Sequence, residues 1–167
     1  DREKAVELLR KRGIVKAEKK KGRETREGVI EAYIHPGARL GVLVEINCET
    51  DFVARTDDFK ALARDIAMQV AASEPIAVSR DDLPEDIVAK EMEIYTEQAK
   101  ASGKPDNVVE KIVQGRLEKF YQEKCLLEQP FIKDPNKTVE EYVKDYIARL
   151  GENITVRRFV RFRLGEE

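Results

Sequence analysis

Several motifs that carry enzyme chemistry are missing from this chain of 167 residues. It has no glycine-rich phosphate-binding loop of the Walker or Rossmann type. Its single histidine, His35, lies in a proline–glycine turn, so a histidine-dependent catalytic pair would have to assemble around that turn. These absences predict a protein that is not an enzyme, uses no cofactor and does not bind a nucleotide directly.

Cysteine is also scarce. Cys48 and Cys125 lie far apart in the chain and lack the spacing of zinc ligands, so no metal site is expected. Two such cysteines make no disulfide framework, and each is best explained as a small core residue. We therefore expect a reducing compartment, with the bacterial cytoplasm preferred to an organellar matrix.

Long apolar runs and a strong charge of one sign are absent too. No run approaches the roughly 18 residues of a membrane span, and no signal-peptide pattern is present. The net charge of −2 argues against a strongly basic nucleic-acid binder. The hydrophobic content of 41% is enough for a folded core. We expect one domain of ordinary size, with or without an appendage, that binds no membrane.

Residues 28–48 alternate with the period of β-strands. One face of a first strand carries Ile30, Ala32 and Ile34, and one face of a second carries Leu40, Val42, Val44, Ile46 and Cys48. Between them, His35-Pro36-Gly37-Ala38 fits a type II turn, because Gly37 can supply the positive φ of the third position. This pattern predicts a β-hairpin.

Helical periodicity follows the hairpin. A helix capped by Thr56 is expected to bury a stripe of Phe59, Leu62, Ala63, Ile66, Ala67, Val70 and Ala71. Prolines fit the starts of two helices over residues 85–101 and 106–124, and their short connection predicts an antiparallel helical hairpin. Residues 130–136 are expected to be a loop. A further helix over residues 139–150 ends at Gly151.

The C-terminal segment 154–164 alternates again. Ile154, Val156, Val160, Phe162 and Leu164 are expected on one face, interrupted by Arg158, with Arg157, Arg161 and Arg163 on the other. A third strand added to the hairpin gives an α+β fold, a three-stranded antiparallel sheet packed with helices. Such a small sheet cannot be covered on both faces by its own helices, so one face is expected to seek a partner.

The N-terminal region is basic. Residues 10–26 hold nine lysines and arginines against two acids. A solvated linker helix is the preferred interpretation over an RNA-binding arm. Together with the arginine-rich tail and its Phe159 and Phe162, this region supports an alternative function, an RNA- or ribosome-associated binding module.

The most informative segment is Glu45–Arg55, which reads E-I-N-C-E-T-D-F-V-A-R. A strand-like run ends there in a polar elbow, and Phe52 stands just before the long helix. Turn rules favour a small polar residue at such a junction. A phenylalanine there either packs into the protein's own core or reaches into a partner. Spacing alone favours the core.

This segment resembles the second signature of the translation elongation factor Ts family. Further blocks are similar to family blocks at residues 126–131, at 151–159 and at 1–13, which resembles the last helix of a small N-terminal domain. The resemblance covers nearly the whole chain. It implies a remnant of that three-helix domain at 1–13 without its first two helices, a linker helix at 14–27, and a core domain at 28–167 that includes the helical hairpin 85–124.

The resemblance also implies the function, that of a guanine-nucleotide exchange factor that binds elongation factor Tu and promotes GDP release during translation elongation. The implied contact residues are Thr50, Asp51, Phe52, Val53 and Ala54, an Asp-Phe tip that pushes between two helices of the GTPase and disturbs Mg²⁺ and phosphate binding. His35 is implied as a second contact. We expect Phe52 to be solvent-exposed in the free protein. Because the chain has one core lobe where the family's long form has two, we expect a C2 homodimer built through the sheet.

Overall fold

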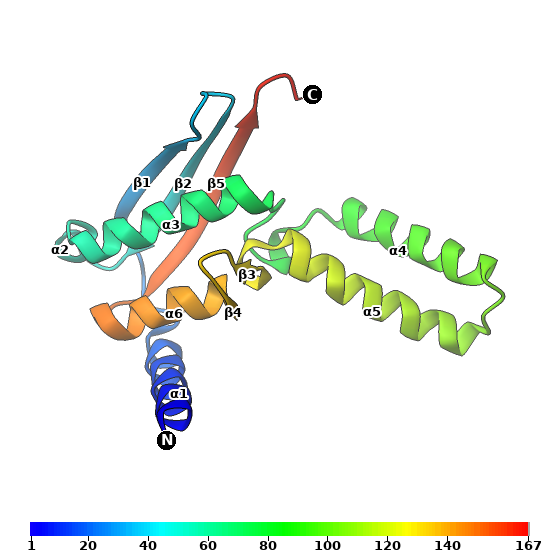
Figure 1. The fold of residues 1–167 in the computed structure, drawn as a ribbon, viewed down its shortest axis with the longest axis horizontal. Helices are drawn as coiled ribbons and strands as arrows, with labels where there is room; N and C mark the ends of the chain where they lie inside the picture. Colours follow the sequence, from blue (N-terminus) through cyan, green and yellow to red (C-terminus); the bar gives the residue numbers. More distant parts are fainter. Residues whose placement is uncertain (167) are drawn as a thin grey trace. The chain divides into compact units, whose positions relative to one another are not determined.

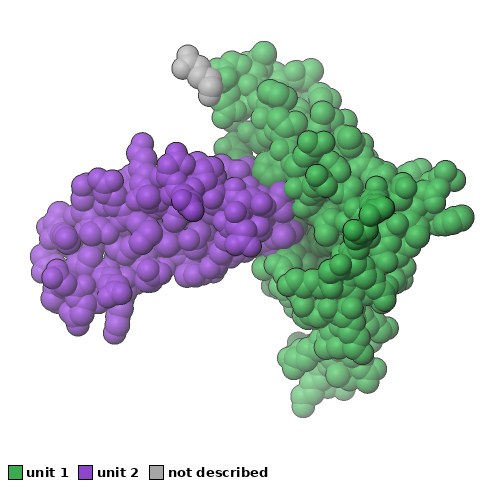
Figure 2. Space-filling view, turned by 180° about the vertical axis from the view of Figure 1, so that it is seen from behind, with its two compact units in different colours: residues 1–74, 130–167 green, residues 75–129 purple. Residues whose placement is uncertain are grey.

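The computed structural model describes residues 1–166 and divides into two compact units. Unit 1 comprises Asp1–Glu74 and the chain from Pro130 onward, and unit 2 comprises Pro75–Gln129 (Figure 2). The elements of unit 1 are α1 (Arg2–Lys20), β1 (Glu27–Ile34), β2 (Leu40–Cys48), α2 (Asp51–Ala54), α3 (Asp57–Ser73), β3 (Pro130–Phe131), β4 (Asp134–Thr138), α6 (Val139–Leu150) and β5 (Ile154–Arg163). The predicted α+β class is confirmed.

A three-stranded antiparallel sheet in the order β1-β2-β5 forms the centre of unit 1. Helix α3 packs across one face of it (Figure 1). The core lies between them and is built from the predicted faces of both elements. The side chains that are fully buried there are Val42, Val44, Ile46 and Cys48 from β2, and Phe59, Leu62, Ala63, Ile66, Ala67 and Val70 from α3. The opposite face of the sheet, which we call the open face, is not covered by α3.

The hairpin turn has the predicted geometry. The amide of Ala38 donates to the carbonyl oxygen of His35 at 2.9 Å. Gly37 takes a φ of 98°, the conformation that a type II turn requires at its third position and that glycine adopts without strain.

Strand β5 departs from the predicted alternation. Its register with β2 shifts at one point, where Glu45 lies opposite Arg158 while the next residue, Ile46, lies opposite Val156. Arg157 is therefore the extra residue of a β-bulge. An extra residue reverses which face each later side chain occupies. The predicted faces were wrong beyond this point, because Val160, Phe162 and Leu164 lie on the open face and not with Ile154 and Val156.

The reversal sends Arg161 toward α3. Its side chain is only 11% exposed. It donates to the carbonyl oxygen of Ala71 at 3.2 Å and to the Glu74 carboxylate at 3.1 Å. A cation beside the last carbonyls of a helix is favourable, so the bulge gives β5 a charged anchor at the C-terminal end of α3.

The predicted loop at 130–136 was wrong, because β3 and β4 pair there as a short hairpin. Phe131 is buried and stacks on Tyr142 of α6, with ring centroids 4.0 Å apart. The Tyr142 hydroxyl donates to Asp65 of α3, and Lys133 also reaches that carboxylate at 2.5 Å. These contacts fix α6 to α3.

The N-terminal helix α1 is continuous from Arg2 to Lys20 and contacts α6 (Figure 1). Ala17 is buried, and Glu18 pairs with Lys144 of α6 at 2.8 Å. No break in the helix marks residue 13, so the division into a remnant and a linker stays a prediction. Its exposed apolar side chains are Val6, Leu8, Leu9 and Val15.

Unit 2 contains the predicted helical hairpin, α4 (Glu85–Ala101) and α5 (Asp106–Lys124), with single turns η1 (Arg80–Asp82) and η2 (Leu126–Glu128). Two buried clusters hold it together: Ala77, Leu83, Leu117, Phe120 and Cys125, and then Tyr95, Ala99, Val109 and Val113. At its base, the Arg80 guanidinium donates to Glu118 at 2.6 Å and to Glu128 at 2.8 Å. Such forked, charge-assisted contacts fix geometry as well as adding stability.

Within residues 1–166, no helix has both the length and the hydropathy of a membrane-crossing segment. Over the same stretch, the structure forms no group of three or more histidine, cysteine or acidic side chains arranged to hold a metal ion.

Candidate functional site

Two threonine caps in succession build the segment that sequence analysis singled out. Thr50 caps α2, and its hydroxyl oxygen accepts a hydrogen bond from the Val53 amide at 3.3 Å. Thr56 caps α3 in the same way, accepting from Phe59 at 3.1 Å and donating to the Val53 carbonyl at 2.7 Å. The chain therefore makes one helical turn between β2 and α3. We call that turn, Thr50–Ala54, the tip.

Phe52 points out of the tip. It is 79% exposed, whereas Ala54 at the end of the same turn is buried. The expected exposure of Phe52 is confirmed, and the alternative of a core-packing ring is wrong. The core is filled instead by Phe59, which is fully buried seven residues later. A free-standing aromatic ring is costly to leave in water and is typical of a binding surface.

Charged groups flank the ring. The Asp51 carboxylate lies 3.2 Å from the Arg55 guanidinium, one helical turn away. The Arg55 side chain is 77% exposed and that of Asp51 is 49% exposed. This ion pair therefore contributes little to stability, and Asp51 can leave Arg55 for another donor at little cost in free energy. Asp51 therefore offers an acceptor beside Phe52.

Beneath the tip, Cys48 and Glu152 hold its backbone. The Cys48 thiol is buried and donates to the Thr50 carbonyl oxygen at 3.1 Å. Burial raises the pKa of this thiol to about 11, and the nearby Glu152 carboxylate adds to the increase. Glu152 accepts hydrogen bonds from the amides of Glu49 and Thr50 and from the Thr50 hydroxyl. Sequence analysis did not single out Glu152, which is 102 residues from Thr50 in the chain.

His35 does not meet the tip. It precedes β2, whereas the tip follows it, so the nine residues of the strand separate them by roughly 30 Å. Its ring is exposed, and its Nδ1 lies 2.9 Å from the Tyr33 hydroxyl. His35 and the tip, which are both expected to contact a partner, therefore lie at opposite ends of β2.

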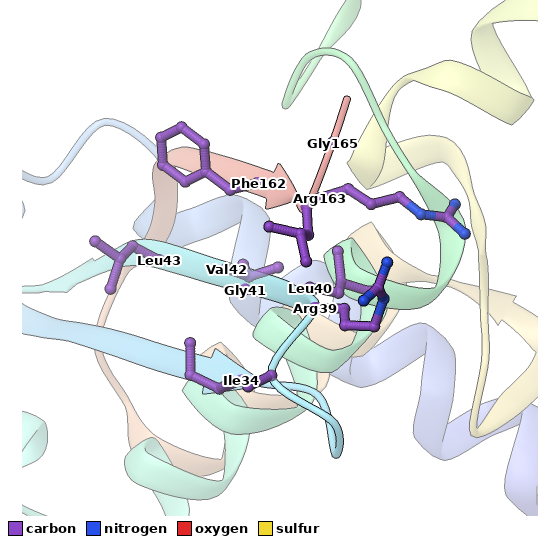
Figure 3. A pocket seen from close by; sticks show the side chains of 11 residues that line it. Ile34, Arg39, Leu40, Gly41, Val42, Leu43, Phe162, Arg163 and Gly165 are labelled. Atoms are coloured by element: carbon purple, nitrogen blue, oxygen red, sulfur yellow. The ribbon is translucent and has the colours of Figure 1, made fainter. Parts of the chain in front are cut away.

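The open face of the sheet is apolar. Its exposed large side chains come from all three strands and from the residue after β5: Ile30, Ile34, Leu43, Val160, Phe162 and Leu164. Toward the hairpin turn, a hollow of about 610 Å³ lies among Ile34, Leu43 and Phe162, with Arg39 and Arg163 at its edge (Figure 3).

Comparison with known proteins identifies the family of the chain. The family model described as Elongation factor TS matches residues 13–166. An elongation factor Ts from Carboxydothermus hydrogenoformans is 63% identical over 99% of this chain and 76% of its own length. One from Moorella thermoacetica is 60% identical over 99% of the chain and 82% of its length. One from Fervidobacterium nodosum is 57% identical over 99% and 84%. The chain belongs to the elongation factor Ts family.

Proposed function

We propose that this protein accelerates the release of GDP from elongation factor Tu and that the tip is the part that does so. Membership of the family gives the coarser statement, a nucleotide exchange factor in translation elongation. The observation that carries the finer one is the 79% exposure of Phe52 on a turn whose backbone is fixed on both sides. An action on this partner implies a bacterial cytoplasmic location.

The mechanism needs no contact with the nucleotide. A GTPase holds GDP through backbone donors on the phosphates, a lysine and a Mg²⁺ ion. A partner that binds best to a conformation in which those groups are displaced lowers the affinity for GDP. The effect is reciprocal, because a bound nucleotide lowers the affinity for the exchange protein by the same ratio as the exchange protein lowers the affinity for the nucleotide. A nucleotide that rebinds therefore promotes release of the exchange protein.

Phe52 suits such a displacement. An aromatic ring that enters a pocket buries a large apolar area and often dominates an interface. Inserted between two helices of the GTPase, it would hold them in the displaced arrangement. Asp51 lies beside Phe52. Its carboxylate can leave Arg55 and accept a hydrogen bond from a donor of the partner instead.

Stopped-flow release of fluorescent GDP from elongation factor Tu tests the proposal. The protein should accelerate release, and Phe52→Ala should reduce that acceleration by about 30-fold or more, the loss of a strong interface anchor. Ile132→Ala is the control, because Ile132 is another exposed apolar residue away from the tip. Unchanged release with Phe52→Ala would contradict the proposal.

A second copy of the chain is the proposed occupant of the open face. Six large apolar side chains exposed on one flat surface are more than a lone domain usually presents. A C2 dimer would cover the open faces of both copies at once. Because His35 and the tip lie at opposite ends of β2, one copy could contact elongation factor Tu by its tip and the other by its His35.

Residues 1–13 are proposed to belong to the family's N-terminal helical domain. One helix cannot bury its own apolar stripe, and α1 leaves Val6 and Leu9 at least half exposed.

The RNA-binding alternative has less support. Phe159 lies opposite Val44 on the covered face and Phe162 opposite Gly41 on the open face, so the two rings cannot stack bases side by side. Arg158 and Arg161 pair with acids of their own chain.

A further inference from the structure

Three hydrogen bonds converge on Glu152 from the two residues that precede Asp51. Its Oε1 accepts from the Glu49 amide at 3.1 Å and from the Thr50 amide at 3.0 Å. Its Oε2 accepts from the Thr50 hydroxyl at 2.6 Å. A carboxylate that accepts several donors makes strong, charge-assisted bonds. One side chain thus holds the backbone just before the exposed ring.

The position of Glu152 is itself fixed. Helix α6 ends at Gly151, whose φ of 76° is the left-handed conformation in which glycine commonly ends a helix. The Gly151 amide still donates to Ile147 at 2.9 Å, so the turn follows the last helical bond directly. Because α6 is held by the buried Val143 and Ile147, Glu152 projects from a rigid support.

A second set of bonds runs in the opposite direction. The Glu49 carboxylate accepts from the Asn153 amide at 2.6 Å. The Asn153 side chain is buried and donates to the Arg23 carbonyl at 2.9 Å. Each segment therefore supplies a carboxylate to the other's backbone. We call Glu49, Thr50, Glu152 and Asn153 the brace.

The Thr50 hydroxyl links the brace to the tip. It has one proton, which goes to Glu152, and this leaves a lone pair for the Val53 amide. Linked hydrogen bonds of this kind strengthen one another. Without Glu152 the hydroxyl is free to rotate, and the Glu49 and Thr50 amides lose this shared acceptor.

We propose that Glu152 is a positioning residue that holds the tip in the turn that presents Phe52. The inference rests on the proposed function of the tip. Because Phe52 is hardly packed against its own chain, its direction depends on the backbone turn that carries it. A preformed turn spares the complex the entropy of ordering it on binding. Glu152 acts through the tip and need not touch the partner.

The first test uses the free protein. Cys48 lies directly under the tip and Cys125 lies in unit 2, and burial raises the pKa of both thiols to about 11. Each reacts with iodoacetamide only when its surroundings open. Glu152→Ala should raise the labelling rate of Cys48 about tenfold, measured by mass spectrometry, and leave that of Cys125 unchanged.

Two variants control this measurement. Glu141→Ala removes a carboxylate that accepts from a backbone amide in the capping box of α6, away from the tip, and should leave Cys48 labelling unchanged. Thr50→Val removes the linking hydroxyl without changing charge and should raise Cys48 labelling as Glu152→Ala does. Equal labelling of Cys48 in wild type and Glu152→Ala would overturn the proposal.

The second test is a double-mutant cycle in the GDP-release assay. Glu152→Ala should lower the maximal stimulated rate about tenfold, yet lower it less than about twofold when Phe52 is already alanine. A residue with an independent structural role would give additive losses, and additivity would contradict the proposal. Glu152→Gln keeps an acceptor oxygen and should recover part of the rate.

The two proposals fail separately. If wild type does not stimulate GDP release, or Phe52→Ala stimulates it fully, the tip mechanism is wrong. If wild type and Phe52→Ala behave as expected while Glu152→Ala matches wild type, only the role of Glu152 is wrong.

Discussion

The tip and the open face both expose large apolar side chains, but they are built differently. The tip presents one aromatic ring, Phe52, on a single helical turn fixed by caps and by the brace. The open face presents six side chains on three strands. The open face also carries the ion pair of Glu45 with Arg158, whose Oε1 and Nε atoms lie 2.8 Å apart.

The difference indicates what each region can bind. A single held ring suits insertion into a narrow pocket, where one anchor supplies most of the affinity. A flat apolar surface suits another flat surface, because many apolar side chains are then removed from water together. One unit of the fold thus carries two apolar surfaces that need not compete for the same partner.

The largest expected effect is on stability, and it differs between a buried and an exposed phenylalanine. Phe59→Ala should lower the free energy of unfolding by about 3–5 kcal/mol, since Phe59 is fully buried beneath the sheet. Phe52→Ala should change it by less than about 0.5 kcal/mol. Urea denaturation measures both. Comparable losses would mean that the Phe52 ring stabilises the fold as Phe59 does and is not a free binding group.

An intermediate effect is expected on the open face. Phe162→Asp places a charge among apolar side chains and should turn a dimer into a monomer at micromolar concentration, measured by light scattering. Ile132→Asp introduces the same charge at an exposed apolar position outside the sheet and should leave the mass unchanged. If the wild-type protein is a monomer at the same concentration, a second copy does not cover the open face.

The smallest effect is expected at the far end of β2. His35→Ala removes the hydrogen bond to Tyr33 at an exposed site and should change stability by less than about 0.5 kcal/mol. If His35 contacts the partner, stimulated GDP release should fall about two- to fivefold, as for a peripheral contact. A loss as large as that of Phe52→Ala would make the turn, and not the tip, the main anchor.

Much of the fold could be predicted because its signals are local. The α3 stripe and the β2 alternation run without interruption, and each belongs to an element long enough to show its period. The bulge could not be predicted, because Val160, Phe162 and Leu164 continue the same alternation on paper. The neighbouring Arg157 and Arg158 were the one sign of an extra residue. Strands β3 and β4 are too short to show a period.

The site divides in the same way. The Thr56 cap was predicted from local rules, whereas the Thr50 cap and its short turn were not. Spacing alone favoured a buried Phe52, and only the family resemblance indicated that it is exposed. Glu152 contacts residues more than 100 positions away, so no local pattern reveals it. Its sequence block, G-E-N, was visible only as part of the resemblance.

The bulge at Arg157 has a consequence for how such a chain can change. Because Arg157 lies outside the register with β2, Val160 and Phe162 lie on the open face. In an unbulged ladder of the same sequence, Arg161 and Arg163 would lie there instead. Deleting Arg157 would leave a regular ladder in which Arg158 follows Val156, so each later residue of β5 would keep its partner on β2 and its face of the sheet. A single-codon deletion at this position should therefore preserve the apolar surface, whereas pairing Arg157 within the ladder would replace it with a positively charged one.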